Sequence, residues 1–173
     1  MESTTGAPRA NPLGDALFQE LLWVHDNLRR DLATVQQLAA RVPSGMSAEV
    51  VRAEIAVLQA KSPLWQFRAN CLYYCRFVHA HHGGEDHLLF PIVRRTNPEL
   101  GGVVDRLEAD HRQIAVHLDE VEGTADALIS ADTTSTRQRM VAALRGLADH
   151  LLAHLTYEEE SIGPALRAWT RWP

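Results

Sequence analysis

The 173-residue chain lacks several features that mark whole classes of protein. Of its 17 basic residues only Lys61 is a lysine, and the formal net charge of −5 leaves no basic field for nucleic acid or anionic lipid. No apolar run reaches the roughly 18 residues that a membrane span needs. We therefore expect a protein with neither a nucleic-acid partner nor a membrane partner.

Cysteine is also scarce. Cys71 and Cys75 lie four residues apart in a helical pattern, which is too few for a disulfide framework and favours buried apolar side chains over a redox pair. The first residues, MESTTGAPRANPLG, contain no apolar stretch of the kind that a secretory signal needs. These absences predict a cytoplasmic protein in a reducing compartment.

Strand-like alternation is rare as well, whereas apolar residues recur at helical spacing in four long segments. The predicted segments run from about Asp15 to Val42, from Pro63 to about Arg95, from Asn97 to Ser130, and from Thr136 to the break at Gly163-Pro164. A short helix over residues 48–60 is predicted in the first connection. We predict an all-α fold, an antiparallel up-down-up-down four-helix bundle over residues 15–167, with a flexible segment (1–14) before it and a tail (168–173) after it.

Histidine, in contrast, is abundant, with nine residues in the chain. An internal repeat organises them. HHGGEDHLLFPIVR (81–94) aligns with HLTYEEESIGPALR (154–167) at an offset of 73 residues, and LLWVHDNLRRDL (21–32) aligns with LEADHRQIAVHL (107–118). The chain therefore reads as two similar helical hairpins, each with one lone histidine and one His-x-x-x-Glu motif.

The spacing places four of these histidines at one depth of the bundle. Each lies 18 residues from the predicted turn of its hairpin and on the apolar stripe of its helix. Two glutamates lie on the same stripes, four residues after the second and the fourth of these histidines. The six residues are His25, His81, Glu85, His111, His154 and Glu158.

Six such groups in an apolar core predict bound cations. Two unpaired buried carboxylates would cost several kcal/mol each, and bound metal ions remove that cost. Imidazole and carboxylate donors suit iron, manganese or zinc, and two carboxylates that can bridge suit a pair of ions. Four histidines, two bridging carboxylates and one bridging oxygen fill about ten of the roughly twelve positions of two six-coordinate ions, which leaves about two for an external ligand.

These motifs resemble the hemerythrin-like family, the HHE cation-binding domain. The resemblance covers roughly residues 15–167 and implies a four-helix bundle around a non-heme di-iron centre, with two oxo- or hydroxo-bridged iron ions held by the same six residues. It implies binding of dioxygen, nitric oxide or peroxide, or sensing of iron or oxygen. Oxygen-carrying members place a further histidine where this chain has Ala115, so the resemblance favours redox reaction or sensing over reversible carriage.

Several alternatives stay open at this point. The protein is a sensor with a separate protein partner, a di-iron oxidoreductase that reduces peroxide or oxygen, or an iron- or zinc-binding regulatory or structural module without small-molecule chemistry. His82 and Asp86 form a competing ligand register, although the His81–Glu85 register is favoured. His150 is a partner of the site, an alternative ligand or an ordinary hydrogen-bonding residue, and Tyr74 packs near the site or contacts it. The remaining histidines, His79, His87 and His117, are predicted at the surface.

Overall fold

The computed structural model describes residues 11–41 and 63–171, with the backbone alone for residues 37–41 and 63–73. Its elements are α1 (Pro12–Arg41), α3 (Pro63–Gly84), the π-helical turn η1 (Glu85–Leu89), α4 (Phe90–Thr96), the 3-10 turn η2 (Pro98–Leu100), α5 (Gly101–Ser130) and α6 (Thr134–Ala168). The predicted short helix over residues 48–60 lies outside the described residues.

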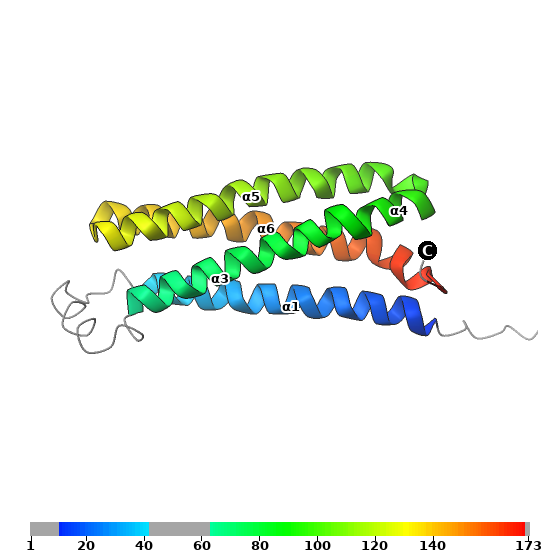
Figure 1. Cartoon of the computed structure of the whole chain (residues 1–173), viewed down its shortest axis with the longest axis horizontal. Coiled ribbons are helices and arrows are strands. Elements are labelled where there is room, and N and C mark those ends of the chain that lie inside the picture. The colour runs from blue at the N-terminus through cyan, green and yellow to red at the C-terminus, as the bar shows by residue number, and fades with distance from the viewer. Residues whose placement is uncertain (1–10, 42–62, 172–173) are drawn as a thin grey trace, which may run out of the picture.

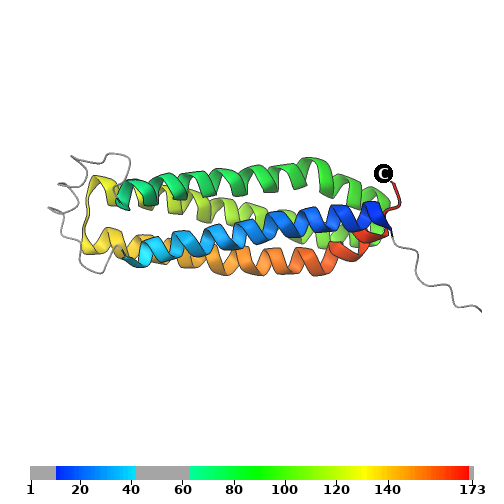
Figure 2. The ribbon, with the colours of Figure 1, turned by 90° about the horizontal axis from the view of Figure 1, so that it is seen from below.

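The long helices lie side by side as a bundle (Figures 1 and 2). α1 packs against α3 and α6, and α5 packs against the same two helices. No strand occurs in residues 11–41 and 63–171, which confirms the prediction of an all-α helical bundle. In the same part of the chain, no helix combines the length and apolar character needed to cross a membrane.

Two helix ends differ from the prediction. α1 begins at Pro12 instead of Asp15, because proline is preorganised for the first helical position. α6 does not end at Gly163-Pro164 but continues to Ala168. The missing N–H of Pro164 removes one backbone hydrogen bond, yet buried side chains on both sides, Ile162 and Leu166, hold this turn against the other helices.

The second long segment is interrupted by a π-helical turn. The N–H of Phe90 donates to the carbonyl of Glu85, five residues earlier, so the turn holds one residue more than an α-helix would. The extra residue rotates the following side chains by about 100°. Leu88 lies seven residues after His81 and would share its face in an uninterrupted α-helix, but it is 67 % exposed, and Phe90 points into the core instead.

A polar layer divides the apolar core into two clusters. One cluster, toward the α5–α6 connection, contains Leu28, Val78, Ile114 and Leu155. The other, toward the start of α1 and the end of α6, contains Leu21, Phe90, Leu107 and Ile162. On every helix the predicted site residues fall between members of these two clusters. The arrangement agrees with the equal depth that the sequence predicts.

Candidate metal centre

Seven buried or nearly buried polar side chains form the layer between the two apolar clusters. They make two donor sets, and within each set one ligand atom per residue lies within 4.8 Å of the others. The first set consists of His82, Glu85, His111 and His154, and the second of His25, His81, Glu85 and Glu158. Each set has the size and chemistry of a site for one metal ion, and Glu85 belongs to both.

Glu85 reaches histidines on both sides of the layer. Its Oε1 atom lies 3.3 Å from Nε2 of His81, and its Oε2 atom lies 3.5 Å from Nε2 of His111. The backbone carbonyl of Glu85 also accepts the hydrogen bond that closes the π-helical turn. The turn therefore sits directly at this carboxylate, a location at which π-bulges are frequent in functional sites.

Glu158 occupies the corresponding position on α6. Its Oε2 atom lies 3.4 Å from Nε2 of His25 and 3.5 Å from Nε2 of His154. Both carboxylate oxygens of Glu158 and both of Glu85 are buried without a hydrogen-bond partner among the described residues. Buried carboxylates without donors are unfavourable, and cations between them and the histidines would satisfy them.

Three histidines of this layer, His81, His82 and His154, have lowered pKa values, which favour the neutral form that metal binding requires. Burial lowers the pKa of His81 to about 4 and that of His154 to about 3, although the nearby Glu158 raises both. Burial likewise lowers the pKa of His82, and the neighbouring His111 lowers it further. Near neutral pH these three rings keep a nitrogen lone pair for a metal ion.

The two glutamates titrate in opposite directions despite their related positions. Burial and the neighbouring Glu158 raise the pKa of Glu85 well above its usual value. Burial also acts upward on Glu158, but the nearby His25 ring and the charge of His154 give a net lowering of its pKa. Without cations, Glu85 therefore keeps its proton to a higher pH than an ordinary glutamate does, and binding of metal would favour its release.

A second layer of carboxylates orients the two lone histidines. Asp86 Oδ1 lies 2.8 Å from Nδ1 of His111, and Glu159 Oε1 lies 2.8 Å from Nδ1 of His25. Asp86 and Glu159 occupy equivalent positions of the 73-residue repeat. Each accepts a hydrogen bond from the outer nitrogen, so that the inner nitrogen points into the site, as metal-binding histidines usually require. Glu159 differs in also pairing with Arg29 at 2.8 Å.

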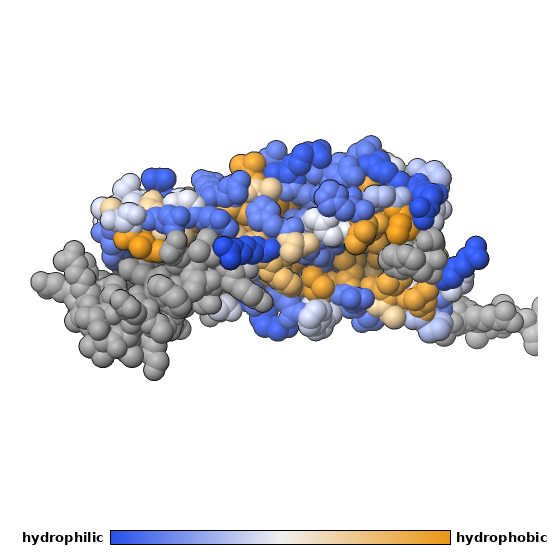
Figure 3. Space-filling model, in the orientation of Figure 1, coloured by the Kyte–Doolittle hydropathy of each residue, from blue (hydrophilic) through white to orange (hydrophobic). Residues whose placement is uncertain are grey.

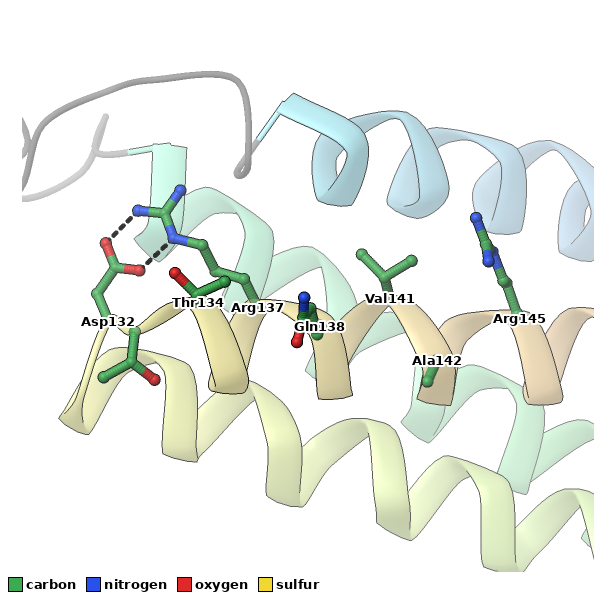
Figure 4. A pocket seen from close by; sticks show the side chains of 8 residues that line it. Asp132, Thr134, Arg137, Gln138, Val141, Ala142 and Arg145 are labelled. Atoms are coloured by element: carbon green, nitrogen blue, oxygen red, sulfur yellow. Dashed lines mark hydrogen bonds and ion pairs between the residues drawn. The ribbon is translucent and has the colours of Figure 1, made fainter.

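Two pockets border the layer at related positions. One, of about 180 Å³, lies between α1, α3 and η1 and includes Leu21, Val24 and Leu89 beside His81 and Glu85. Figure 3 shows apolar side chains gathering between the polar surfaces of α1 and α3–α4. The other, of about 340 Å³, lies between α5 and α6 beside His154. A larger pocket, about 620 Å³, lies away from the layer, at the start of α6 between Asp132 and Arg145 (Figure 4).

All six sequence-predicted site residues meet in this layer, and their role as ligands stays a prediction. The structure adds His82, whose ring stacks on that of His111 with centroids 4.0 Å apart. The sequence treated His81 and His82 as competing registers, but both rings point into the core, because adjacent residues reach two different donor sets there. The signal in the sequence for a second inward-facing histidine was the adjacent pair His81-His82, directly before Gly83-Gly84-Glu85. Asp86 does not replace Glu85 but contacts His111 from outside.

Other polar residues lie away from the layer. His150 is exposed, its Nδ1 atom is 3.1 Å from the carbonyl of Gly146, and its ring lies 4.5 Å from that of His117. His79 and His87 are exposed, as predicted, and His117 is half-buried. Tyr74 and Cys75 are buried in the first apolar cluster, which agrees with packing roles for both. The side chain of Cys71 lies outside the described residues.

The comparisons with known proteins place this geometry in a family. The chain matches the family described as the Hemerythrin HHE cation binding domain over residues 18–166. No similar curated protein and no similar solved structure was found. The matched region contains every residue of both donor sets, together with Asp86 and Glu159. The chain therefore belongs to the hemerythrin HHE cation-binding domain family.

Proposed function

We propose that this chain is a cytoplasmic non-heme di-iron protein that binds or reacts with a small molecule, namely dioxygen, nitric oxide or peroxide. The observation that carries the proposal is that Glu85 belongs to two donor sets at once, while Glu158 reaches a histidine of each. Carboxylates placed between two groups of histidines suit a pair of neighbouring ions. The proposed scaffold is an up-down-up-down bundle with a short helix over residues 48–60.

The donors fit iron because of their chemical types and because several donor atoms lack a hydrogen-bond partner. Neutral imidazoles and carboxylates suit iron, with manganese or zinc as alternatives. Several donor atoms of the layer are buried without a hydrogen-bond partner among the described residues, including Nε2 of His25, His81 and His82. Bound ions would supply the redox and ligand-binding chemistry, and the protein's part is to hold the donors, keep the imidazoles neutral and exclude water.

The two donor sets are unequal, and the inequality predicts where an external ligand binds. One set holds three histidines and the other holds two, His25 and His81. With His82 included, the side chains and one bridging oxygen fill about eleven of roughly twelve positions. The remaining position would belong to the ion beside His25 and His81.

The neighbouring pocket favours a small neutral ligand at that position. Its walls near His81 are formed mainly by aliphatic side chains such as Leu21, Val24 and Leu89. An apolar wall offers few partners for water or for an anion, whereas dioxygen and nitric oxide need none. Peroxide would have to give up hydrogen bonds to enter, so we rank it below the two diatomic gases.

Metal analysis with optical spectroscopy tests the proposal. Protein produced in iron-replete cells should contain about two irons per chain and show the absorption band of an oxo-bridged pair. The reduced protein should change spectrum on exposure to air, to nitric oxide or to peroxide. A folded chain with a single zinc ion and no iron would instead support the alternative of a structural or regulatory module.

A further inference from the structure

The two pockets that border the metal layer occupy equivalent places in the internal repeat. His81 in the first pocket corresponds to His154 in the second at the offset of 73 residues. At the offset of 86 residues that relates α1 to α5, Val24 corresponds to Asp110. The same architecture therefore gives each half of the molecule one opening beside one histidine, and the openings differ in the side chains that line them.

The opening beside His154 is lined by more polar side chains than the one beside His81, where aliphatic side chains predominate and Glu20 and Glu85 are the carboxylates. Asp110 and Asp149 line it from α5 and α6, and His150 lies next to them. Arg106 is the only cationic side chain among its described lining residues. It stacks on the ring of Tyr157 at 3.6 Å and lies 3.8 Å from Asp110, beyond hydrogen-bonding distance. The two carboxylates consequently give this pocket a net negative charge.

His154 connects this pocket to the metal layer. Its side chain is 1 % exposed and lines the pocket, and its Nδ1 atom is buried with no hydrogen-bond partner. The nearest carboxylate oxygen, Oδ2 of Asp110, is 3.8 Å away from that nitrogen. On its inner side, Nε2 of His154 lies 3.5 Å from Glu158 and 3.1 Å from Nε2 of His111. One ring thus separates the charged pocket from the donors.

We infer that the pocket between α5 and α6 is a transient binding site for hydrated divalent cations, through which ferrous ions reach the metal layer. This inference rests on the proposed function of the layer. Six waters at about 30 Å³ each occupy roughly 180 Å³, so a hexahydrated ion fits within the pocket of about 340 Å³. Carboxylates and an imidazole at the surface suit a hydrated divalent ion before it loses water.

The division of access has a physical reason. The pocket beside His81 is smaller, at about 180 Å³, and aliphatic side chains form most of its walls, so a hydrated cation with the volume of six waters is disfavoured there relative to the larger pocket beside His154. A neutral diatomic molecule gains nothing from the carboxylates of the other pocket. Two openings of different polarity therefore allow ions to be loaded on one side of the layer and the small ligand to bind on the other.

Loading kinetics of the metal-free, full-length protein test the inference. The protein is mixed anaerobically with ferrous ion, the reaction is stopped with a fast chelator, and bound iron is counted over time. Asp149→Asn should load about 3- to 10-fold more slowly and Asp149→Lys more slowly still, because local carboxylates raise the cation concentration at the opening. The final iron content should be unchanged in both.

Substitutions of an aspartate outside the pocket control for net charge. Asp119 is exposed on α5 outside the pocket, so Asp119→Asn and Asp119→Lys should load within about twofold of the unmodified protein. Asp110→Val, which introduces the residue of the other repeat, should also slow loading without lowering the final content. A lower final content would make Asp110 part of the ligand shell and overturn its place on the path.

The outcomes separate this inference from the proposed function. Equal loading rates for the Asp149 and Asp119 variants, with two irons bound at the end, would overturn the cation path and leave the di-iron proposal intact. Slower loading in Val24→Lys by the same factor as in Asp149→Lys would also overturn the path, since the effect would not depend on the pocket. Failure of the unmodified protein to bind iron at all would overturn the proposed function.

Discussion

The two halves of the molecule build the same layer with different helices. In the first half, α3 carries His81 and His82 and the π-helical turn η1 carries Glu85, whereas in the second half the uninterrupted helix α6 carries both His154 and Glu158. The position of His82 is taken by Leu155 in the second half, and both side chains are buried. The halves therefore agree in the glutamates that reach histidines on both sides of the layer and differ by one inward-facing histidine.

This difference shows how a duplicated hairpin becomes an asymmetric site. The π-helical turn compensates for the additional inward-facing residue by restoring the following side chains, such as Phe90, to the core face. The openings beside His81 and His154 also differ, since aliphatic side chains form most of the walls of the first and Asp110, Asp149 and Arg106 line the second. Symmetry thus accounts for the shared carboxylates, and departures from it account for the unequal donor sets and their access.

The largest expected effect concerns what the halves share. Glu85→Ala and Glu158→Ala should each remove at least one iron ion, because each carboxylate reaches histidines from both sides of the layer. Iron analysis of purified, folded protein provides the measurement. Glu160→Ala is the matched control, since Glu160 is exposed on α6, and it should retain the full iron content. Retention of two irons in Glu85→Ala would remove the shared carboxylate from the site.

The next effect concerns the donor that distinguishes the halves. His82→Leu makes the first half resemble the second and should weaken or remove the ion held with His111 and His154, with loss of up to one iron per chain. His79→Leu is the control, because His79 is exposed on the same helix. Without metal, His82→Leu should raise the urea midpoint, since it replaces a buried, unpartnered nitrogen with an apolar group. An unchanged iron content and spectrum would show that His82 only packs.

The outer carboxylates should have a smaller effect on affinity. Asp86→Asn and Glu159→Gln should each lower iron affinity about 10- to 100-fold, measured by competition with a chelator, because they orient His111 and His25. We expect the larger loss for Asp86, since Arg29 already offsets part of the charge of Glu159. Equal affinity in both variants and the unmodified protein would mean that packing alone orients these rings.

Acid should destabilise the metal-free protein. Folding lowers the pKa of His81 to about 4 and of His154 to about 3 from 6.5, so below pH 6.5 the unfolded chain binds more protons than the folded one. The raised pKa of Glu85 acts in the opposite direction above about pH 4.5, but on one group against three histidines. The urea midpoint should therefore fall between pH 6.5 and 4. A urea midpoint that rises as the pH is lowered from 6.5 to 4 would contradict the neutral state of these rings.

The smallest effects concern the free energy of unfolding at two glycines, one of which, Gly83, differs between the halves. Gly83 lies just before the π-helical turn, where the second half has Thr156, and a Cβ atom there would meet nothing within 4 Å. Gly83→Ala should raise the free energy of unfolding by about 0.5–1 kcal/mol through higher helix propensity. Gly14→Ala is the contrast, because its Cβ atom would meet the backbone carbonyl of Arg167, and it should cost about 1–3 kcal/mol. Denaturant titration measures both changes, and a lower free energy of unfolding in Gly83→Ala would show that the turn depends on that glycine.

Much of the fold and the site could be predicted because both depend on periodic patterns. Helical spacing of apolar residues and breaks at Pro, Gly and Asn-Pro indicated the long helices, and their bounds agree within a few residues except at the end of α6. The repeat and the equal distances from the turns brought His25, Glu85 and Glu158 to one layer. Pro164 misled the prediction because local helix propensity is weaker than the packing of Ile162 and Leu166 on either side.

Sequence by itself determined the helical class, the duplicated hairpin and six of the seven polar residues in the layer, because each follows from spacing along one helix. Only the tertiary structure decided the rest. The π-helical turn at Glu85 sets which side chains of α3 and α4 face inward, so the joint presence of His81 and His82 appears only when four helices surround them. The unequal openings depend likewise on α1, α3, α5 and α6 meeting, since residues such as Val24 and Asp110 gain their role from side chains on other helices.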